Sequence, residues 1–227
     1  MTDENIVLVG GLWLDPSAWD AVVAEIEKSG RNAVVVALPG QGDGNVAATL
    51  DDQVGAVVAA VDAAPGRPVL VGHSAACGLA WMAADARPER VSKVVLVGGF
   101  PSADGDNYSP SFPIENGAMP FPGWEPFEGA DSADLDEEAR KRFTAAAVPV
   151  PEAVAKATVR LTDERRYDLP VVMVCPEYTP AELREWRDAG ELPELARVKH
   201  VDLVDIDSGH WPMLTRPAEL ARILTSA

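Results

Sequence analysis

The sequence predicts an α/β fold in which helices cover both faces of a parallel sheet. Short apolar segments rich in β-branched residues recur along the chain, as expected for strands buried on both faces. Segments with the apolar spacing of amphipathic helices lie between them. Such alternation, with right-handed crossovers, produces a doubly wound sheet. With 227 residues, 47% of them hydrophobic, the chain can form one such domain.

The expected strands are the short apolar segments themselves. They are Ile6–Val9, Ala33–Leu38, Val69–Val71, Lys93–Val97, Val171–Cys175 and Val201–Ile206. Parallel strands end at one common edge of the sheet, and ligands of doubly wound proteins bind beyond that edge. Residues that directly follow these strands are therefore the first candidates for a functional site.

Three helices are predicted between the first four strands. The first follows Asp15-Pro16, which suit a helix cap and first position, and it ends at Gly30. The second follows Thr49-Leu50-Asp51-Asp52, whose spacing resembles a capping box. The third covers Ala75–Ala84 and begins directly after the third strand.

The alternation is interrupted between Gly98 and Asp168, where proline, glycine and aromatic residues are frequent. Two helices are expected there, at Leu135–Ala147 and Pro151–Val159. An irregular loop of this length is uncommon in a compact domain, so the segment predicts a small lid inserted after the fourth strand. The expected organisation is a core of residues 1–98 and 169–227 with a lid of residues 99–168. Its aromatic side chains either form the core of the lid or contact a substrate.

The charge of the chain argues against polyanionic partners. A formal net charge of −17 repels nucleic acid phosphates and anionic membrane surfaces. No apolar run has the roughly 18 residues of a membrane-spanning helix, and the acidic start lacks the features of a signal peptide. We therefore expect a cytoplasmic protein that acts on a small molecule, without nucleic acid or membrane partners. The oligomeric state is not encoded in any recognisable pattern.

The cysteines and histidines do not form a metal-binding pattern. Cys77 and Cys175 are far apart in sequence and are expected to be buried thiols. His73, His200 and His210 lack the spacing of zinc ligands. The sequence thus predicts neither a metal nor a cofactor.

A serine follows the third strand within Gly72-His73-Ser74-Ala75-Ala76. Small residues two positions before and after a nucleophile are required where a strand turns sharply into a helix. Ser74 is therefore the predicted nucleophile.

A histidine follows the last strand within Asp207-Ser208-Gly209-His210. The order of serine first and histidine late matches that of hydrolases with this turn, so His210 is the predicted general base. His200 lacks such a context and is expected at the surface.

Acyl transfer also requires donors for a developing oxyanion. Val9-Gly10-Gly11-Leu12 follows the first strand, and glycines allow a close approach of backbone to substrate. The backbone N–H groups of Leu12 and Ala75 are the predicted donors, although Gly10-Gly11 is also compatible with a plain tight turn.

These motifs resemble the α/β-hydrolase superfamily, and in particular its compact branch of plant methylesterases and hydroxynitrile lyases. The resemblance is carried by Gly72–Ala76, Val9-Gly10-Gly11, Leu38-Pro39-Gly40-Gln41-Gly42, Gly209-His210, Thr49–Asp52 and Ala86–Val91. It covers nearly the whole chain except the lid. It implies an α/β-hydrolase fold with a six-stranded sheet and a serine hydrolase without a cofactor.

The catalytic acid departs from the pattern of the superfamily. That pattern places an aspartate after the strand Val171–Cys175, where this chain has Glu177. We favour Glu177, because its longer side chain can offset a shift of one position. Asp104, Asp205 and Asp207 remain alternatives, as does a Ser-His dyad without an acid.

The leading hypothesis is hydrolysis of a small carboxylic ester or lactone through an acyl-enzyme. Aromatic side chains near the motifs suggest an apolar group on the substrate. The predicted substrate contacts are Trp13, Trp81, Trp124 and Trp211. Two alternatives are a lyase of the hydroxynitrile type and a small-molecule-binding homologue without turnover.

Overall fold

The computed structural model describes residues 5–226 and contains the predicted six-stranded parallel sheet. The strand order is β2-β1-β3-β4-β7-β8. The strands are β1 (Ile6–Val9), β2 (Ala33–Val35), β3 (Val69–His73), β4 (Lys93–Val97), β7 (Val171–Cys175) and β8 (Val201–Asp205). All six predicted strands are confirmed. The second and sixth are shorter than expected at their carboxyl ends, and the third is longer.

The register of the central strands brings their carboxyl ends to one edge. His73 at the end of β3 pairs with Val97 at the end of β4. Cys175 at the end of β7 pairs with Asp205 at the end of β8. Loops that follow β3, β4, β7 and β8 therefore start side by side, as expected for a parallel sheet.

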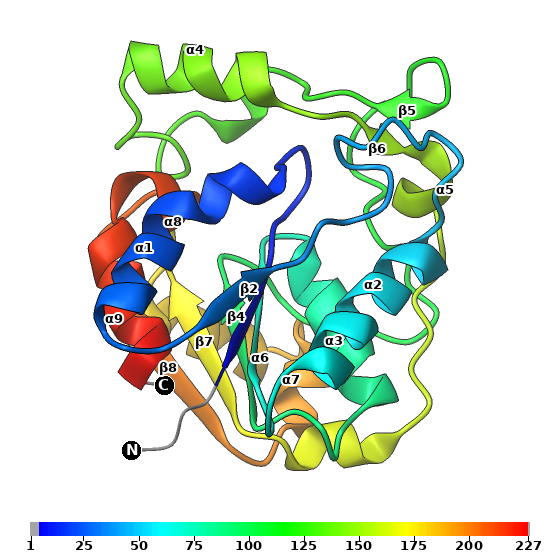
Figure 1. Cartoon of the computed structure of the whole chain (residues 1–227), viewed down its shortest axis with the longest axis vertical. Coiled ribbons are helices and arrows are strands. Elements are labelled where there is room, and N and C mark those ends of the chain that lie inside the picture. Colours follow the sequence, from blue (N-terminus) through cyan, green and yellow to red (C-terminus); the bar gives the residue numbers. More distant parts are fainter. Residues whose placement is uncertain (1–4, 227) are drawn as a thin grey trace.

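Helices cover both faces of this sheet (Figure 1). One face carries α1 (Asp20–Lys28), α8 (Pro212–Thr215) and α9 (Pro217–Ser226), and the other carries α2 (Leu50–Ala63) and α3 (Ala76–Ala86). The loop after β7 leads to α6 (Pro180–Asp188) and α7 (Pro193–Arg197). Among residues 5–226, no helix has the length and apolar character needed to cross a bilayer.

The predicted helix starts agree with the observed caps. The side chain of Asp15 accepts a hydrogen bond from the Ser17 N–H, and a short 3-10 turn at Pro16–Trp19 precedes α1. Thr49 and Asp52 form the reciprocal hydrogen bonds of a capping box at the start of α2. The third helix begins one residue later than predicted and ends two residues later.

Residues 99–168 form short elements above the carboxyl edge of the sheet. They include an antiparallel pair, β5 (Ala118–Met119) with β6 (Val150–Pro151), and the helices α4 (Glu137–Ala146) and α5 (Glu152–Ala155). In Figure 1, α4 crosses the top of the molecule above α1 and α8.

The predicted helix Pro151–Val159 is wrong in its length. Beyond Ala155 the chain pairs with an earlier segment instead of continuing α5. The Tyr108 N–H donates to the Ala157 carbonyl at 2.8 Å, and the Val159 N–H donates to the Asp106 carbonyl at 2.8 Å. These long-range backbone bonds replace the local bonds that a longer helix would make.

A buried ionic cluster fastens the end of this segment to the core. Arg166, which is 4% exposed, contacts Asp85 of α3 at 3.1 Å and Glu194 of α7 at 3.0 Å. The Tyr167 hydroxyl donates to Glu194 at 2.8 Å. Removal of one partner would leave a buried charge unpaired, which is strongly destabilising.

One glycine of α2 offers a test of this fold. A Cβ added to Gly55 would meet no heavy atom within 4 Å, and its φ lies outside the left-handed region. We expect Gly55→Ala to stabilise the protein by about 0.5–1 kcal/mol, because glycine loses more backbone freedom than alanine in a helix. Thermal unfolding beside wild type measures the change. A lower melting temperature would contradict this placement of Gly55.

Candidate active site

The loops after β3, β7 and β8 bring three predicted residues into one hydrogen-bonded chain. His210 Nε2 lies 2.8 Å from Ser74 Oγ. His210 Nδ1 lies 2.8 Å from Glu177 Oε1. A hydroxyl, an imidazole and a carboxylate linked in this order have the geometry that a catalytic triad requires.

Ser74 occupies a sharp turn that only small neighbours permit. Its φ is 55°, in the left-handed region that non-glycine residues rarely adopt. A Cβ on Gly72 would lie 2.4 Å from the Ala76 carbonyl oxygen. A Cβ on Gly99, which follows β4, would lie 2.4 Å from the Ser74 carbonyl oxygen. The turn is thus enclosed by a glycine of β3 and a glycine of the loop after β4, and it presents Ser74 Oγ towards His210.

The partners of His210 determine its tautomer. An ionised carboxylate only accepts hydrogen bonds, so Nδ1 of His210 carries a proton and donates a hydrogen bond to Glu177. Nε2 is then free to accept the proton of the Ser74 hydroxyl. The side chains of His210 and Glu177 are 13% and 15% exposed, which limits solvent screening of their interaction.

The other candidate acids lie elsewhere. The carboxylate of Asp104 accepts a hydrogen bond from the Leu161 N–H at 2.8 Å. Asp205 and Asp207 are exposed, and in the described part of the chain neither forms a hydrogen bond or ion pair with His210. Of the candidates, the structure brings Glu177 to the histidine.

The loop after β1 approaches Ser74 closely. A Cβ on Gly11 would lie 2.9 Å from both Ser74 Cβ and the His73 carbonyl oxygen, so a glycine is needed there. Within residues 5–226, the backbone N–H groups of Leu12 and Ala75 donate to no protein acceptor. Both donors are therefore available for an oxyanion.

His73 was not assigned a role from the sequence, although it lies within the serine motif. Its Nε2 is 2.7 Å from the backbone carbonyl of His210, which can only accept, so this nitrogen carries a proton. Burial and, to a smaller extent, the nearby His210 lower the pKa of His73 from 6.5 to about 3, against the opposing effect of this hydrogen bond. His73 is thus a neutral, buried donor that holds the backbone of the predicted base.

The lowered pKa of His73 makes stability depend on pH. Between pH 6.5 and about 3 the unfolded chain binds a proton at His73 that the folded protein does not, so stability falls as the pH falls. A loss of about 2 kcal/mol is expected on going from about pH 7 to about pH 5. Urea unfolding at both values measures it. His73→Gln should show a smaller loss, and an equal loss in both proteins would contradict this role of His73.

Aromatic side chains form a cluster beside His210. Trp211 is 2% exposed, and its ring centroid lies 4.9 Å from that of His210. The ring centroids of Trp211 and Trp124 are 5.4 Å apart, and those of Trp13 and Phe121 are also 5.4 Å apart. The cluster comprises Trp13, Phe112, Phe121, Trp124, Phe127, Phe143 and Trp211. It thus joins the two loops of the site to the segment 99–168.

Trp81 does not lie at this site, although the sequence suggested it as a substrate contact. Its side chain is fully buried in α3, and its indole N–H donates to Glu194 at 2.8 Å. It packs against Tyr167 of the buried ionic cluster. A side chain without exposed surface in this position cannot contact a substrate beside Ser74.

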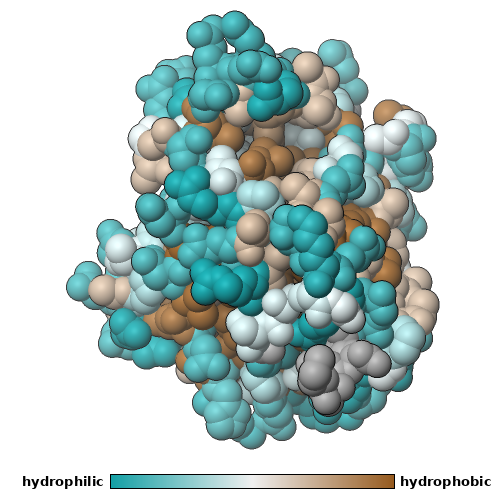
Figure 2. All heavy atoms as spheres, turned by 60° about the vertical axis from the view of Figure 1, so that its left-hand side comes forward, coloured by the Kyte–Doolittle hydropathy of each residue, from teal (hydrophilic) through white to brown (hydrophobic). Residues whose placement is uncertain are grey.

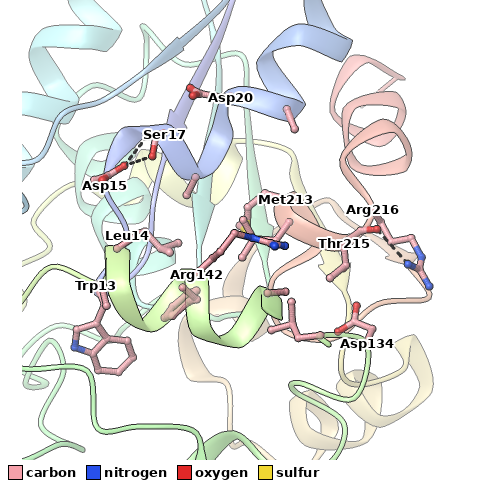
Figure 3. Close-up of a pocket in the computed structure, with 18 of the residues that line it drawn as sticks. Trp13, Leu14, Asp15, Ser17, Asp20, Asp134, Arg142, Met213, Thr215 and Arg216 are labelled. Carbon is pink, nitrogen blue, oxygen red and sulfur yellow. Dashed lines mark hydrogen bonds between the residues drawn. The ribbon is translucent and has the colours of Figure 1, made fainter. Parts of the chain in front are cut away.

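A pocket of about 580 Å³ lies between α4 and the helices α1 and α8. Figure 3 shows it with Trp13 on one side, Asp134 on the other and Arg142 of α4 between them. The surface in Figure 2 is largely hydrophilic, with a hydrophobic recess in the upper part of the molecule. Ser74, His210 and Glu177 are not among the residues that line the pocket. Trp13 and Phe143 line it and belong to the aromatic cluster, so the pocket adjoins the site without containing it.

Comparison with known proteins identifies the family of this chain. The model of a family described as the alpha/beta hydrolase family matches residues 6–223. No curated protein sequence matches the chain.

Solved structures share the fold over nearly the full length of both chains. An extracellular alpha/beta-hydrolase from Paenibacillus, described as homologous to tobacco salicylic acid binding protein 2, has a TM-score of 0.80 at 18% identity and covers 99% of this chain and 98% of its own. A pyrethroid hydrolase from Sphingobium faniae has a TM-score of 0.72 at 20% identity, with 98% and 96% covered. Tomato methylketone synthase I in complex with 2-tridecanone has a TM-score of 0.72 at 18% identity, with 100% and 98% covered.

Proposed function

Because this chain belongs to the alpha/beta hydrolase family, we propose that it is a serine hydrolase that cleaves a small carboxylic ester or lactone. The observation that carries the proposal is the hydrogen-bonded chain from Ser74 through His210 to Glu177, with both contacts at 2.8 Å. A serine is a weak nucleophile unless a base removes its proton. Here His210 is the proposed base, and Glu177 is the group that orients it.

The first half of the reaction forms an acyl-enzyme. His210 Nε2 takes the proton from Ser74 Oγ as this oxygen attacks the carbonyl carbon of the substrate. The N–H groups of Leu12 and Ala75 donate to the resulting oxyanion. Glu177 stabilises the imidazolium of His210. The bond to the alcohol then breaks, and the imidazolium gives its proton to the departing oxygen.

The second half releases the acid. A water molecule loses a proton to His210 Nε2 and attacks the carbonyl carbon of the acyl-enzyme, forming a second oxyanion. The bond to Ser74 Oγ breaks, and the proton on His210 returns to the serine. In a lactone the alcohol remains part of the product, which is a hydroxy acid.

The aromatic cluster supports a substrate with an apolar group. The Trp211 ring packs against the His210 ring, with centroids 4.9 Å apart, and Trp13 directly follows the proposed donor Leu12 in the chain. Trp13 packs against Phe112, and Trp211 packs against Trp124 and Phe143. We propose that residues 99–168 act as a lid that excludes water from the acyl-enzyme. The bound 2-tridecanone of the tomato protein is likewise an apolar molecule.

A fluorophosphonate probe and a panel of p-nitrophenyl esters test the proposal. The probe should attach to Ser74, and short-chain esters should be hydrolysed with a burst of p-nitrophenol if deacylation is slow. A folded protein that neither reacts with the probe nor hydrolyses any ester would refute it. Cyanide release from cyanohydrins without ester hydrolysis would instead indicate a lyase. Saturable binding without turnover would indicate a binding protein.

A further inference from the structure

The loop that carries His210 is fastened to the segment 99–168 as well as to the core. The Gly209 N–H donates to Asp134 Oδ2 at 2.9 Å. The His210 N–H donates to the backbone carbonyl of Asp131 at 2.7 Å. On the opposite side, His73 donates to the His210 carbonyl. The backbone of the predicted base is thus held from two directions.

The contact between the two segments leaves no free space. A Cβ on Gly209 would lie 2.3 Å from the Asp131 carbonyl oxygen and 2.5 Å from Asp134 Oδ1. Asp134 Oδ1 is itself buried and, within residues 5–226, has no hydrogen-bond partner. A buried carboxylate oxygen without a partner is costly, so the position of Asp134 is not explained by its own stability.

The segment 131–134 is in turn held by its neighbours. Ser132 is fully buried, and its hydroxyl donates to the Phe127 carbonyl at 2.6 Å. Arg140 of α4 donates to the Ser132 carbonyl at 2.8 Å. Asp134 is therefore attached to a fixed segment and can act as a rigid anchor for Gly209.

We propose that Asp134 is a positioning residue, which holds the Gly209-His210 backbone so that His210 Nε2 remains within reach of Ser74 Oγ. This inference rests on the proposed function, in which that contact transfers the serine proton. The chemistry of the contact supports this role. The carboxylate of Asp134 accepts from the N–H of Gly209, the residue before the proposed base. A hydrogen bond to a charged group is stronger than one between neutral groups. Misplacement of a catalytic group by about 1 Å can lower the rate about 10²-fold.

Substitutions of Asp134 separate positioning from charge. Asp134→Ala should lower kcat for a p-nitrophenyl ester by about 10- to 100-fold with KM changed less than about twofold, since the base and not the binding surface is displaced. Asp134→Asn keeps an acceptor for the Gly209 N–H without the charge, so it should recover most of this loss. Equal losses in both variants, or wild-type kcat in Asp134→Ala, would overturn the proposal.

Asp136 provides the matched control. It lies two residues away and caps α4 by accepting from the Ala139 N–H at 2.7 Å, and among residues 5–226 it has no hydrogen bond or ion pair with the His210 loop. Asp136→Ala should therefore lower the melting temperature while kcat stays at the wild-type value. A loss of kcat equal to that of Asp134→Ala would show that the effect comes from general destabilisation and would overturn the proposal.

Two further measurements extend the test, and the second does not depend on ester turnover. Gly209→Ala places a Cβ against Asp131 and Asp134 and so disrupts the same contact. It should lower kcat as Asp134→Ala does, whereas Gly55→Ala should leave kcat unchanged. Carbon-13 relaxation of the His210 ring reports its order directly, and Asp134→Ala should lower the order parameter. If the wild-type protein hydrolyses no ester, the proposed function is wrong. The relaxation measurement then still tests whether Asp134 positions His210. An unchanged order parameter would overturn its positioning role.

Discussion

Ser74→Ala is expected to lower kcat by about 10⁶-fold, the effect of removing the nucleophile from a well-studied serine protease. Without Oγ no acyl-enzyme can form, and His210 has no proton to remove from the residue. What remains is the contribution of the oxyanion donors and of substrate binding. The measurement is initial rates on the ester that wild type hydrolyses fastest, together with loss of labelling by a fluorophosphonate.

The same substitution should leave the fold intact. In the structure the Ser74 hydroxyl forms a hydrogen bond with the His210 side chain. Its removal therefore leaves no group of the hydrophobic core without a hydrogen-bond partner. Alanine has the same Cβ as serine and meets the same strain at a φ of 55°. A melting temperature near that of wild type serves as the control. Retained turnover in a folded Ser74→Ala protein would remove Ser74 from the mechanism.

Glu177→Gln is expected to lower kcat by at least about 100-fold and up to about 10⁴-fold, the effect of the corresponding change in a serine protease. Glutamine can donate to Nδ1 from its amide, which favours the tautomer with the proton on Nε2. That nitrogen then cannot accept the proton of Ser74. The amide also lacks the charge that stabilises the imidazolium.

The test compares Glu177→Gln with Asp104→Asn, Asp205→Asn and Asp207→Asn by kcat and melting temperature. Of the four, the variant of Glu177 should lose activity while its melting temperature changes little. Normal turnover in Glu177→Gln with a loss in one of the asparagine variants would assign the acid elsewhere. Normal turnover in all four would mean a Ser-His dyad.

The sheet was predictable from the sequence because its signal is local. Strands buried on both faces consist almost wholly of apolar residues, so β3, β4 and β7 stand out from the polar loops around them. The turn at Ser74 was predictable for a related reason: sterics at one sharp corner exclude large side chains, and this leaves a short pattern in the sequence.

The contacts that depend on distant segments were not predictable. The predicted helix after Pro151 ends early because its backbone bonds with residues 106–109, and no local pattern marks that pairing. Asp134 lies in a run of acidic residues that resembles any solvated surface. His73 and the pair Gly98-Gly99 do carry local signals, since they lie in the serine motif and directly after β4. The role of Glu177 stays a prediction until its variant is measured.

The glycine at position 98 leaves room for the contact between Glu177 and His210. Gly98 has a φ of 57°, and a Cβ there would lie 3.4 Å from both Glu177 Oε2 and His210 Nδ1, and 3.2 Å from Pro176 Cγ. An added Cβ would thus be strained by the left-handed backbone and tight against Pro176, and it would fill the space that borders Glu177 and His210. The space beside the hydrogen bond between His210 and Glu177 therefore depends on a residue from a third strand end, after β4.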